Sequence, residues 1–206
     1  MKLMERELKN FTPDFVARKS VACFGNRIIC LGSGISNSNV NYPTETTLFQ
    51  CALPAKYQPT VLEDSCTLRD PFGNYFYIQK GKPHQTEGLQ HSFHNKSRKA
   101  TEGKFLTAWI DHGKAPQNAE YEYLILLRPT EKERKEARQS YIIKQQDCQA
   151  HIVFDKLTQV TACSFFEAYQ NAQADLIQQA DAETLVMYKK NESDIQLSIC
   201  SPNLNI

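Results

Sequence analysis

Glu45 is a candidate for acid–base or electrostatic chemistry, because it follows Pro43 and opens the apolar stretch TTLFQ. A carboxylate at the head of a strand can be fully solvated, can cap a loop, or can point into a site. The residue types and spacing around Glu45 leave these three alternatives open.

The histidines do not form a recognisable catalytic or metal-binding set. They are His84, His91, His94, His112 and His151. His91 and His94 are three residues apart, so on a strand they would point to opposite faces and would not share a zinc ion. His112 directly follows Asp111, and adjacent strand residues do not face each other, so no Ser/His/Asp arrangement is assigned. We expect no metal site and no cofactor.

A basic stretch, QHSFHNKSRKATEGKF at 90–105, suits an anionic polymer. Its guanidinium and ammonium groups can pair with sulfate or carboxylate groups. The candidate substrate-binding residues are Asn95, Lys96 and Arg98. The alternative is an ordinary solvated loop.

The aromatic residues are expected mainly in the core. Trp109 together with Tyr75 and Tyr77 could instead form a platform on which a sugar ring stacks.

The segment LGSGISNS at 31–38 has two glycines after a strand. A phosphate-binding loop would need a third glycine and a following helix, and neither is present. We therefore expect a loop in which the backbone turns sharply.

Composition excludes several classes of protein. The chain has 206 residues and a formal net charge of +1, so it carries no field of one sign suited to nucleic acid or an anionic membrane. No apolar run approaches the ~18 residues of a transmembrane helix. The N-terminus lacks the apolar segment of a signal peptide, so the protein is either cytoplasmic or an internal piece of a longer secreted chain.

The seven cysteines are odd in number and none lie at C-x-x-C spacing. This excludes a metal knuckle and a thioredoxin-like motif. Small buried residues with free thiols are the main expectation, and one or two disulfides are the alternative.

The elements that position these residues are mostly strands. Apolar residues alternate with a period of two between turn signals such as Gly25-Asn26 and the segment 70–74, which predicts an antiparallel β-sandwich. The run YEYLILL at 121–127 predicts a central strand buried on both faces. The expected strands are 16–24, 27–31, 46–53, 65–69, 75–79, 88–94, 105–110, 121–127, 141–144, 150–154, 160–166, 184–188 and 195–200.

Two segments differ from this pattern. Residues 130–140 predict one short helix, with Thr130 as N-cap and Glu133 completing a capping box. Residues 168–182 predict a loop or a short helix.

Several blocks of the sequence together resemble one known family. LGSGISNS followed by ETTLFQ, and later AWIDHG with YEYLILL, are specific in combination, and DPFGNYFYIQ, HIVFDKLTQVTACSFF and TLVMYKKNESDIQLSICSPNLN follow the same order. These blocks are similar to the chondroitin sulfate ABC lyases of polysaccharide lyase family 8. The similarity extends from about Arg18 to Asn205.

The resemblance implies a fold and a reaction. Family members place an α/α toroid of helices before a large antiparallel β-supersandwich, with a small β domain after it. The reaction is β-elimination at a uronic acid of a sulfated glycosaminoglycan. A His, a Tyr and an Arg of the toroid do the chemistry, and a Glu of the sandwich, whose motif matches Glu45, completes the group as an auxiliary.

The resemblance therefore predicts that residues 1–206 form a single β-sandwich domain of a larger lyase, lacking the toroid and the small β domain. The isolated chain should be inactive, and the parent should be secreted or periplasmic. The expected partners are a sulfated glycosaminoglycan and the toroid, with no nucleic acid or membrane. The alternatives are a non-catalytic carbohydrate-binding module and a purely structural domain that braces a toroid.

Overall fold

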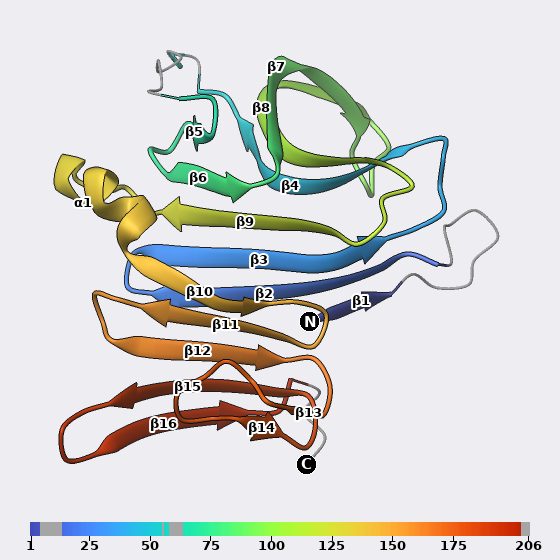
Figure 1. Ribbon diagram of the computed structural model, residues 1–206. Coiled ribbons are helices and arrows are strands. Elements are labelled where there is room, and N and C mark those ends of the chain that lie inside the picture. Colours follow the sequence, from blue (N-terminus) through green and yellow to red (C-terminus); the bar gives the residue numbers. More distant parts are fainter. Residues whose placement is uncertain (5–13, 55, 58–63, 203–206) are drawn as a thin grey trace.

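The computed structural model describes residues 1–4, 14–54, 56–57 and 64–202, and its elements are almost all strands (Figure 1). The helical elements of this part are α1 (Glu131–Glu136) and the 3-10 turn η1 (Ala137–Gln139). The strands are β1 (Lys2–Met4), β2 (Val16–Phe24), β3 (Arg27–Ser36), β4 (Pro43–Ala52), β5 (Thr67–Arg69), β6 (Tyr75–Lys80), β7 (Lys82–Phe93), β8 (Ala100–Lys114), β9 (Ala119–Leu126), β10 (Tyr141–Gln146), β11 (Ala150–Asp155), β12 (Val160–Phe165), β13 (Tyr169–Gln170), β14 (Gln179–Ala180), β15 (Thr184–Lys190) and β16 (Ile195–Cys200).

All strand pairs are antiparallel and fall into four sheets. The largest has the order β1-β2-β3-β9-β6-β5, and a second has the order β10-β11-β12-β15-β16. A three-stranded sheet has the order β4-β8-β7, and β13 pairs with β14. With one short helix, this architecture confirms the expected antiparallel β-supersandwich.

The six-stranded sheet is covered on both faces. One face packs against the three-stranded sheet through a core that contains Cys30, Tyr121 and Ile110. The other face packs against the five-stranded sheet through Leu31, Leu124 and Val153. The near-continuous apolar run at 121–127 follows from this arrangement, because both faces of β9 lie in a core.

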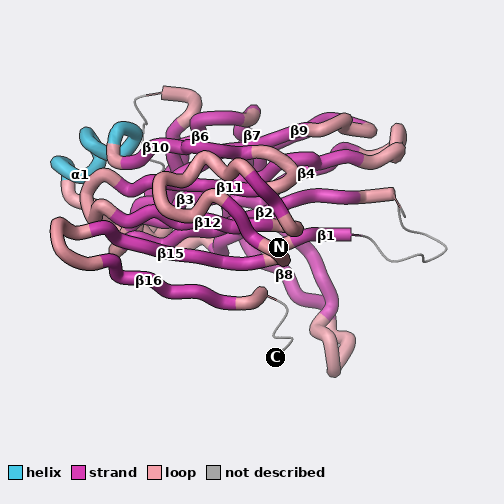
Figure 2. The backbone as a smooth tube through the Cα atoms, turned by 60° about the horizontal axis from the view of Figure 1, so that its bottom comes forward, coloured by secondary structure: helices cyan, strands magenta, loops and turns pink. Residues whose placement is uncertain are grey.

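A third core lies on the far side of the five-stranded sheet. Ile152 and Phe165 there contact Ala172 and Ala174, which belong to the segment that links β13 and β14. The strands of the six-stranded and five-stranded sheets run in similar directions in Figure 2, as expected for aligned sandwich packing. The helix alternative for 168–182 was therefore wrong, because this segment covers a sheet as a short strand pair.

The predicted helix N-terminus is confirmed. The Thr130 hydroxyl accepts a hydrogen bond from the Glu133 backbone, and the Glu133 carboxylate accepts one from the Thr130 backbone. The guanidinium of Arg134 lies 5.1 Å from the ring centroid of Tyr75, and that of Arg138 lies 5.4 Å from Tyr77. These cation–π contacts fasten the helical segment to β6.

The expected loop at 31–38 was wrong over its first part, because β3 continues to Ser36. Both glycines lie where the strand excludes a larger side chain, Gly32 for a steric reason and Gly34 for a conformational one. A Cβ on Gly32 would collide with the Tyr121 ring. Gly34 has φ +58° and lies where the register between β3 and β9 shifts, so it forms a bulge that a β-carbon would strain.

The cysteines are all free thiols. Only Cys30 and Cys163 are buried, and burial raises the pKa of Cys30 to about 11 and that of Cys163 to about 12. Both are therefore neutral, inert core residues. The expectation of buried thiols was wrong for Cys23, Cys148 and Cys200, which are exposed.

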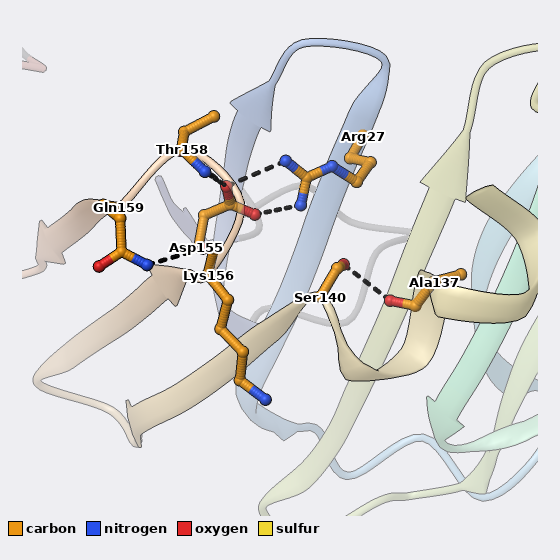
Figure 3. Close-up of polar contacts among 7 residues, drawn as sticks. All are labelled: Arg27, Ala137, Ser140, Asp155, Lys156, Thr158 and Gln159. Atoms are coloured by element: carbon orange, nitrogen blue, oxygen red, sulfur yellow. Dashed lines mark hydrogen bonds and ion pairs between the residues drawn. The ribbon is translucent and has the colours of Figure 1, made fainter. Parts of the chain in front are cut away.

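A buried ion pair connects the six-stranded and five-stranded sheets (Figure 3). Arg27 at the start of β3 forms a bidentate pair with Asp155 at the end of β11, and the Nη2–Oδ2 distance is 2.9 Å. Asp155 Oδ2 also accepts hydrogen bonds from the backbone and the hydroxyl of Thr158. Asp155 is fully buried and Arg27 nearly so, so these bonds offset the desolvation of both charges.

A second polar link joins the same two layers. His151 is buried, with Nδ1 2.8 Å from Ser20 Oγ and Nε2 2.8 Å from Ser33 Oγ. The Ser33 hydroxyl donates to the Asp147 carbonyl, so it accepts from His151 Nε2–H. The Ser20 hydroxyl donates to His151 Nδ1 when the imidazole is neutral. Burial lowers the pKa of His151 to about 3.

We expect Asp155→Ala to destabilise the fold by about 3–5 kcal/mol, because it leaves the Arg27 guanidinium buried without its counter-ion. Urea unfolding followed by circular dichroism measures this loss. The double variant Arg27→Met/Asp155→Leu should recover much of the stability. A single variant as stable as the wild type would show that water reaches Arg27.

We expect the free energy of unfolding to fall between pH 6.5 and pH 3 by about 1.4 kcal/mol per pH unit from His151 alone. The folded pKa lies below the unfolded one, so the stabilisation is complete above the unfolded pKa and is lost as the pH drops. Urea unfolding at several pH values measures the slope, and His151→Gln should flatten it. Equal slopes in the two proteins would contradict a neutral buried His151.

Candidate functional site

Glu45 lies on β4, at one edge of the three-stranded sheet, and its side chain is exposed. Its neighbour Thr46 is buried, so Glu45 points away from the sandwich core. The register between β4 and β8 shifts on both sides of Glu45, between Pro43 and Glu45 and between Thr47 and Phe49. Bulges of this kind commonly change the direction of side chains next to active sites.

Two asparagines hold the chain that leads into β4. Asn37 is buried, donates from Nδ2 to Thr44 Oγ1 at 2.7 Å, and accepts from the Asn39 backbone at 2.9 Å. Asn39 Oδ1 accepts from the backbones of Asn41 and Tyr42. These Asx-type bonds explain why an asparagine-rich segment precedes the strand, and they give Glu45 a defined position.

Glu45 belongs to a charged row that crosses the sheet. Its direct partner on β8 is Asp111, and the partner of Asp111 on β7 is Lys82. Directly paired residues share a face with Cβ atoms about 4.5–5.5 Å apart, so two carboxylates lie side by side. Like charges in this position cost stability. Asp111 has Lys82 on its other side and accepts a hydrogen bond from the Gly113 backbone at 2.8 Å, so Glu45 is the carboxylate of the row that a further cation would stabilise most.

The next row of the same face carries the single tryptophan. Thr47, Trp109 and His84 are paired across the three strands. The rings of His84 and Trp109 stack with centroids 5.5 Å apart and planes 15° apart. His84 Nε2 lies 3.9 Å from Asp111 Oδ2, so the two rows form one cluster around Glu45.

The alternative of a platform that joins Trp109 to Tyr75 and Tyr77 was wrong. The two tyrosines stack on each other, with centroids 6.3 Å apart, and pack in the core between the six-stranded and five-stranded sheets. Trp109 faces outward from the three-stranded sheet, which covers the opposite face of the six-stranded sheet. The period-two pattern places all three rings on strands but cannot say which layer each one joins.

The inner face of the same sheet holds the site in place. Thr46 Oγ1 lies 2.9 Å from His112 Nε2, which ties β4 to β8 beneath Glu45. Burial, the largest cause, lowers the pKa of His112. Asp111 and His112 lie on opposite faces, as the sequence predicts, so they form no acid–base pair.

Asn95, Lys96 and Arg98 lie in the turn between β7 and β8, and all three are exposed. The His94 backbone N–H donates to the Lys99 carbonyl at 2.9 Å, and the Arg98 backbone N–H donates to the His94 carbonyl at 2.9 Å, which closes the turn. The turn and Glu45 lie at opposite ends of the β7–β8 hairpin, because Ala100, beside the turn, and Asp111, the partner of Glu45, are eleven positions apart along β8. The sequence pattern did not place Asp111 beside Glu45 or His84 beside Asp111. The block AWIDHG was a signal for Asp111 alone.

In the described part of the chain, no group of three or more His, Cys, Asp or Glu side chains is arranged to hold a metal ion. Nor does this part contain a helix long and apolar enough to cross a bilayer.

The comparisons with known proteins agree with the fold. Polysaccharide lyase family 8, super-sandwich domain, matches residues 3–138. The chain is 39% identical to the chondroitin sulfate ABC exolyase of Proteus vulgaris, over 92% of this chain and 20% of that protein. It is 33% identical to the chondroitin sulfate ABC endolyase of Proteus vulgaris, over 97% of this chain and 22% of that protein.

A solved structure shares the fold. The chondroitin AC lyase of Streptomyces coelicolor A3, in complex with chondroitin sulphate, superimposes with a TM-score of 0.79 at 17% identity, over 99% of this chain and 28% of that chain. The chain thus spans about a fifth of the length of the two curated relatives named above. Because the family match extends over residues 3–138 of an antiparallel stack of sheets, the chain belongs to polysaccharide lyase family 8 and contains its super-sandwich domain.

Proposed function

We propose that this chain is the β-sandwich part of a lyase that cleaves a chondroitin- or dermatan-type glycosaminoglycan by β-elimination at a uronic acid. In this proposal Glu45 is an auxiliary residue, and the groups that move protons belong to an upstream helical toroid of the parent enzyme. The parent acts outside the cytoplasm, where such polymers occur.

The observation that supports this proposal is the solvent-facing row of Glu45 and Asp111 beside Trp109. Adjacent carboxylates repel each other. Lys82 is paired with Asp111 on the side away from Glu45, so Glu45 is the carboxylate that a further cation would stabilise most. A guanidinium from a second domain would supply this cation. Trp109 provides an apolar surface next to it, so the face has the features of one wall of a cleft.

The chemistry explains why such a wall is needed. A base removes the proton at C5 of the uronate, the bond from C4 to the glycosidic oxygen breaks, and an acid protonates the leaving oxygen. The proton at C5 becomes acidic only if the negative charge that develops on the uronate is neutralised. Glu45 acts on the cation or the acid–base groups that do this, by orienting them and balancing their charge.

Within the described residues, no His–Tyr pair on the outer face of the three-stranded sheet could carry the proton transfers. His84 is stacked on Trp109, and His112 and Tyr121 belong to the buried side. The basic turn with Asn95, Lys96 and Arg98 would contact the anionic polymer at a distance from Glu45.

The isolated 206-residue chain should not produce the ultraviolet absorbance of an unsaturated uronide from chondroitin sulfate or dermatan sulfate, because the proton-transfer groups lie outside it. A spectrophotometric assay with high enzyme concentration tests this. Adding the toroid, as a longer chain, should restore turnover. Robust turnover by the isolated chain would contradict the assignment of Glu45 as an auxiliary.

In the complete enzyme, Glu45→Gln should lower kcat and kcat/KM together by on the order of 10–100-fold, with little change in KM, because the charge acts in the transition state. Steady-state kinetics on chondroitin sulfate measures this change. The matched control is Glu192→Gln, at the exposed tip between β15 and β16. An unchanged kcat would make Glu45 a solvated strand residue, and a large fall in Tm would make it a structural anchor.

A further inference from the structure

A hollow of about 630 Å³ lies at the far end of the face that carries Glu45. Its lining includes Gln50 of β4, Gln90 and Ser92 of β7, and Gly103 and Phe105 of β8. Asp111, Trp109, Thr107, Phe105 and Gly103 alternate along β8, so they share one face. The hollow and the Glu45 cluster are therefore two ends of one surface, and β8 covers about 20 Å between Asp111 and Phe105.

The hollow exists because the three-stranded sheet is strongly curled, as Figure 1 shows for β7 and β8. Gln50 Nε2 donates to Gln90 Oε1 at 2.6 Å, and Gln90 Nε2 donates to Thr107 Oγ1 at 3.1 Å. The residue of β7 that pairs with Thr107 is Thr86, which in a flat strand would lie about 13 Å from Gln90. Coiling brings the two edge strands together above β8 and makes the face concave.

Phe105 is surrounded by small residues within this curled sheet. Its cross-strand partners are Ala52 and Gly88, and Gly103 lies beside it on β8. A Cβ on Gly103 would lie 3.0 Å from the Phe105 ring, whereas a Cβ on Gly88 would have nothing within 4 Å. Glycine weakens a strand. We therefore interpret Gly88 and Gly103 as residues that keep space open next to the Phe105 ring.

Around the ring are groups that suit sugar hydroxyls and anions. Gln50, Gln90, Ser92 and Thr101 supply amides and hydroxyls. The carboxylates nearby are partnered, since Glu87 pairs with Lys104 at 2.9 Å and Glu102 lies 3.5 Å from His91. The adjoining turn adds Lys96, Arg98 and Lys99, so cations outnumber carboxylates along the rim.

We infer that this hollow is a separate binding subsite for one or two rings of an anionic glycosaminoglycan chain that lies along β8. Phe105 stacks against the apolar face of a sugar ring, the amides and hydroxyls bind its polar edge, and the basic turn binds sulfate or carboxylate groups. The inference rests on the proposed function for its polymer, but it does not require Glu45 to act in catalysis.

The test uses the 206-residue chain and a chondroitin sulfate hexasaccharide, followed by NMR. The amide of Gly103, which lines the hollow, and the amide of Gly88, which is paired with Phe105 at its border, report on the hollow. The Trp109 indole reports on the Glu45 end. The key variant is Gly88→Val, which places a side chain in the open space. Valine favours a strand, so Tm should stay equal or rise, while affinity should fall on the order of tenfold.

A second variant, Phe105→Leu, removes the ring but keeps an apolar side chain, and it should weaken binding similarly. Its matched control is Phe72→Leu, an exposed aromatic in the turn between β5 and β6, which should bind like the wild type. Added salt should weaken binding, and an uncharged glucan hexasaccharide should leave both glycine amides unshifted.

Three results would contradict the proposal of a binding subsite. One is equal affinity of Gly88→Val and the wild type, and another is an equal response to the uncharged glucan. The third is a shift of the Trp109 indole without shifts of Gly88 and Gly103, which would leave the proposed function intact. Conversely, loss of turnover in the Glu45 experiment has no bearing on the glycine amides, so the two ideas fail separately.

Discussion

The central strands β3 and β9 of the six-stranded sheet are buried on both faces, and the other layers of the described structure are arranged around them. An antiparallel sheet that is apolar on both sides needs a cover on each. The three-stranded sheet covers one face and the five-stranded sheet covers the other. The five-stranded sheet then has an outer face of its own, against which the segment around β13 and β14 packs.

Apolar packing alone does not set the register between layers. Between the six-stranded and five-stranded sheets, the register is set by buried polar links. Arg27 must meet Asp155, and His151 must lie between Ser20 and Ser33. Each of these groups would be left unsatisfied by a shift of one residue. The glycines of β3 add a steric constraint, because Gly32 lets the Tyr121 ring cross the strand.

The three-stranded sheet is the layer whose outer face can carry functional residues. Its inner residues, such as Ala108 and Ile110, satisfy the core, while its outer residues need no partner within the chain. That outer face carries the row of Glu45 and Asp111, the ring of Trp109 and the hollow around Phe105. Coiling of the long β7–β8 hairpin turns a flat wall into a concave one, which is the shape that a chain-like ligand requires.

The sequence by itself determined the fold class, the helix cap at Thr130 and the doubly buried strand at 121–127, because these depend on local periodicity and neighbouring residues. The family of the chain was also readable from its ordered blocks, and with it the choice of Glu45 as a candidate. Only the tertiary structure decided which layer each strand joins. It separated Trp109 from Tyr75 and Tyr77 and turned an expected loop at Gly32 and Gly34 into a bulged strand. It also placed Asp111 beside Glu45 and His84 beside Asp111. Such relations depend on pairings between residues far apart in sequence, and alternation tells which side of a strand a residue faces but not what lies there.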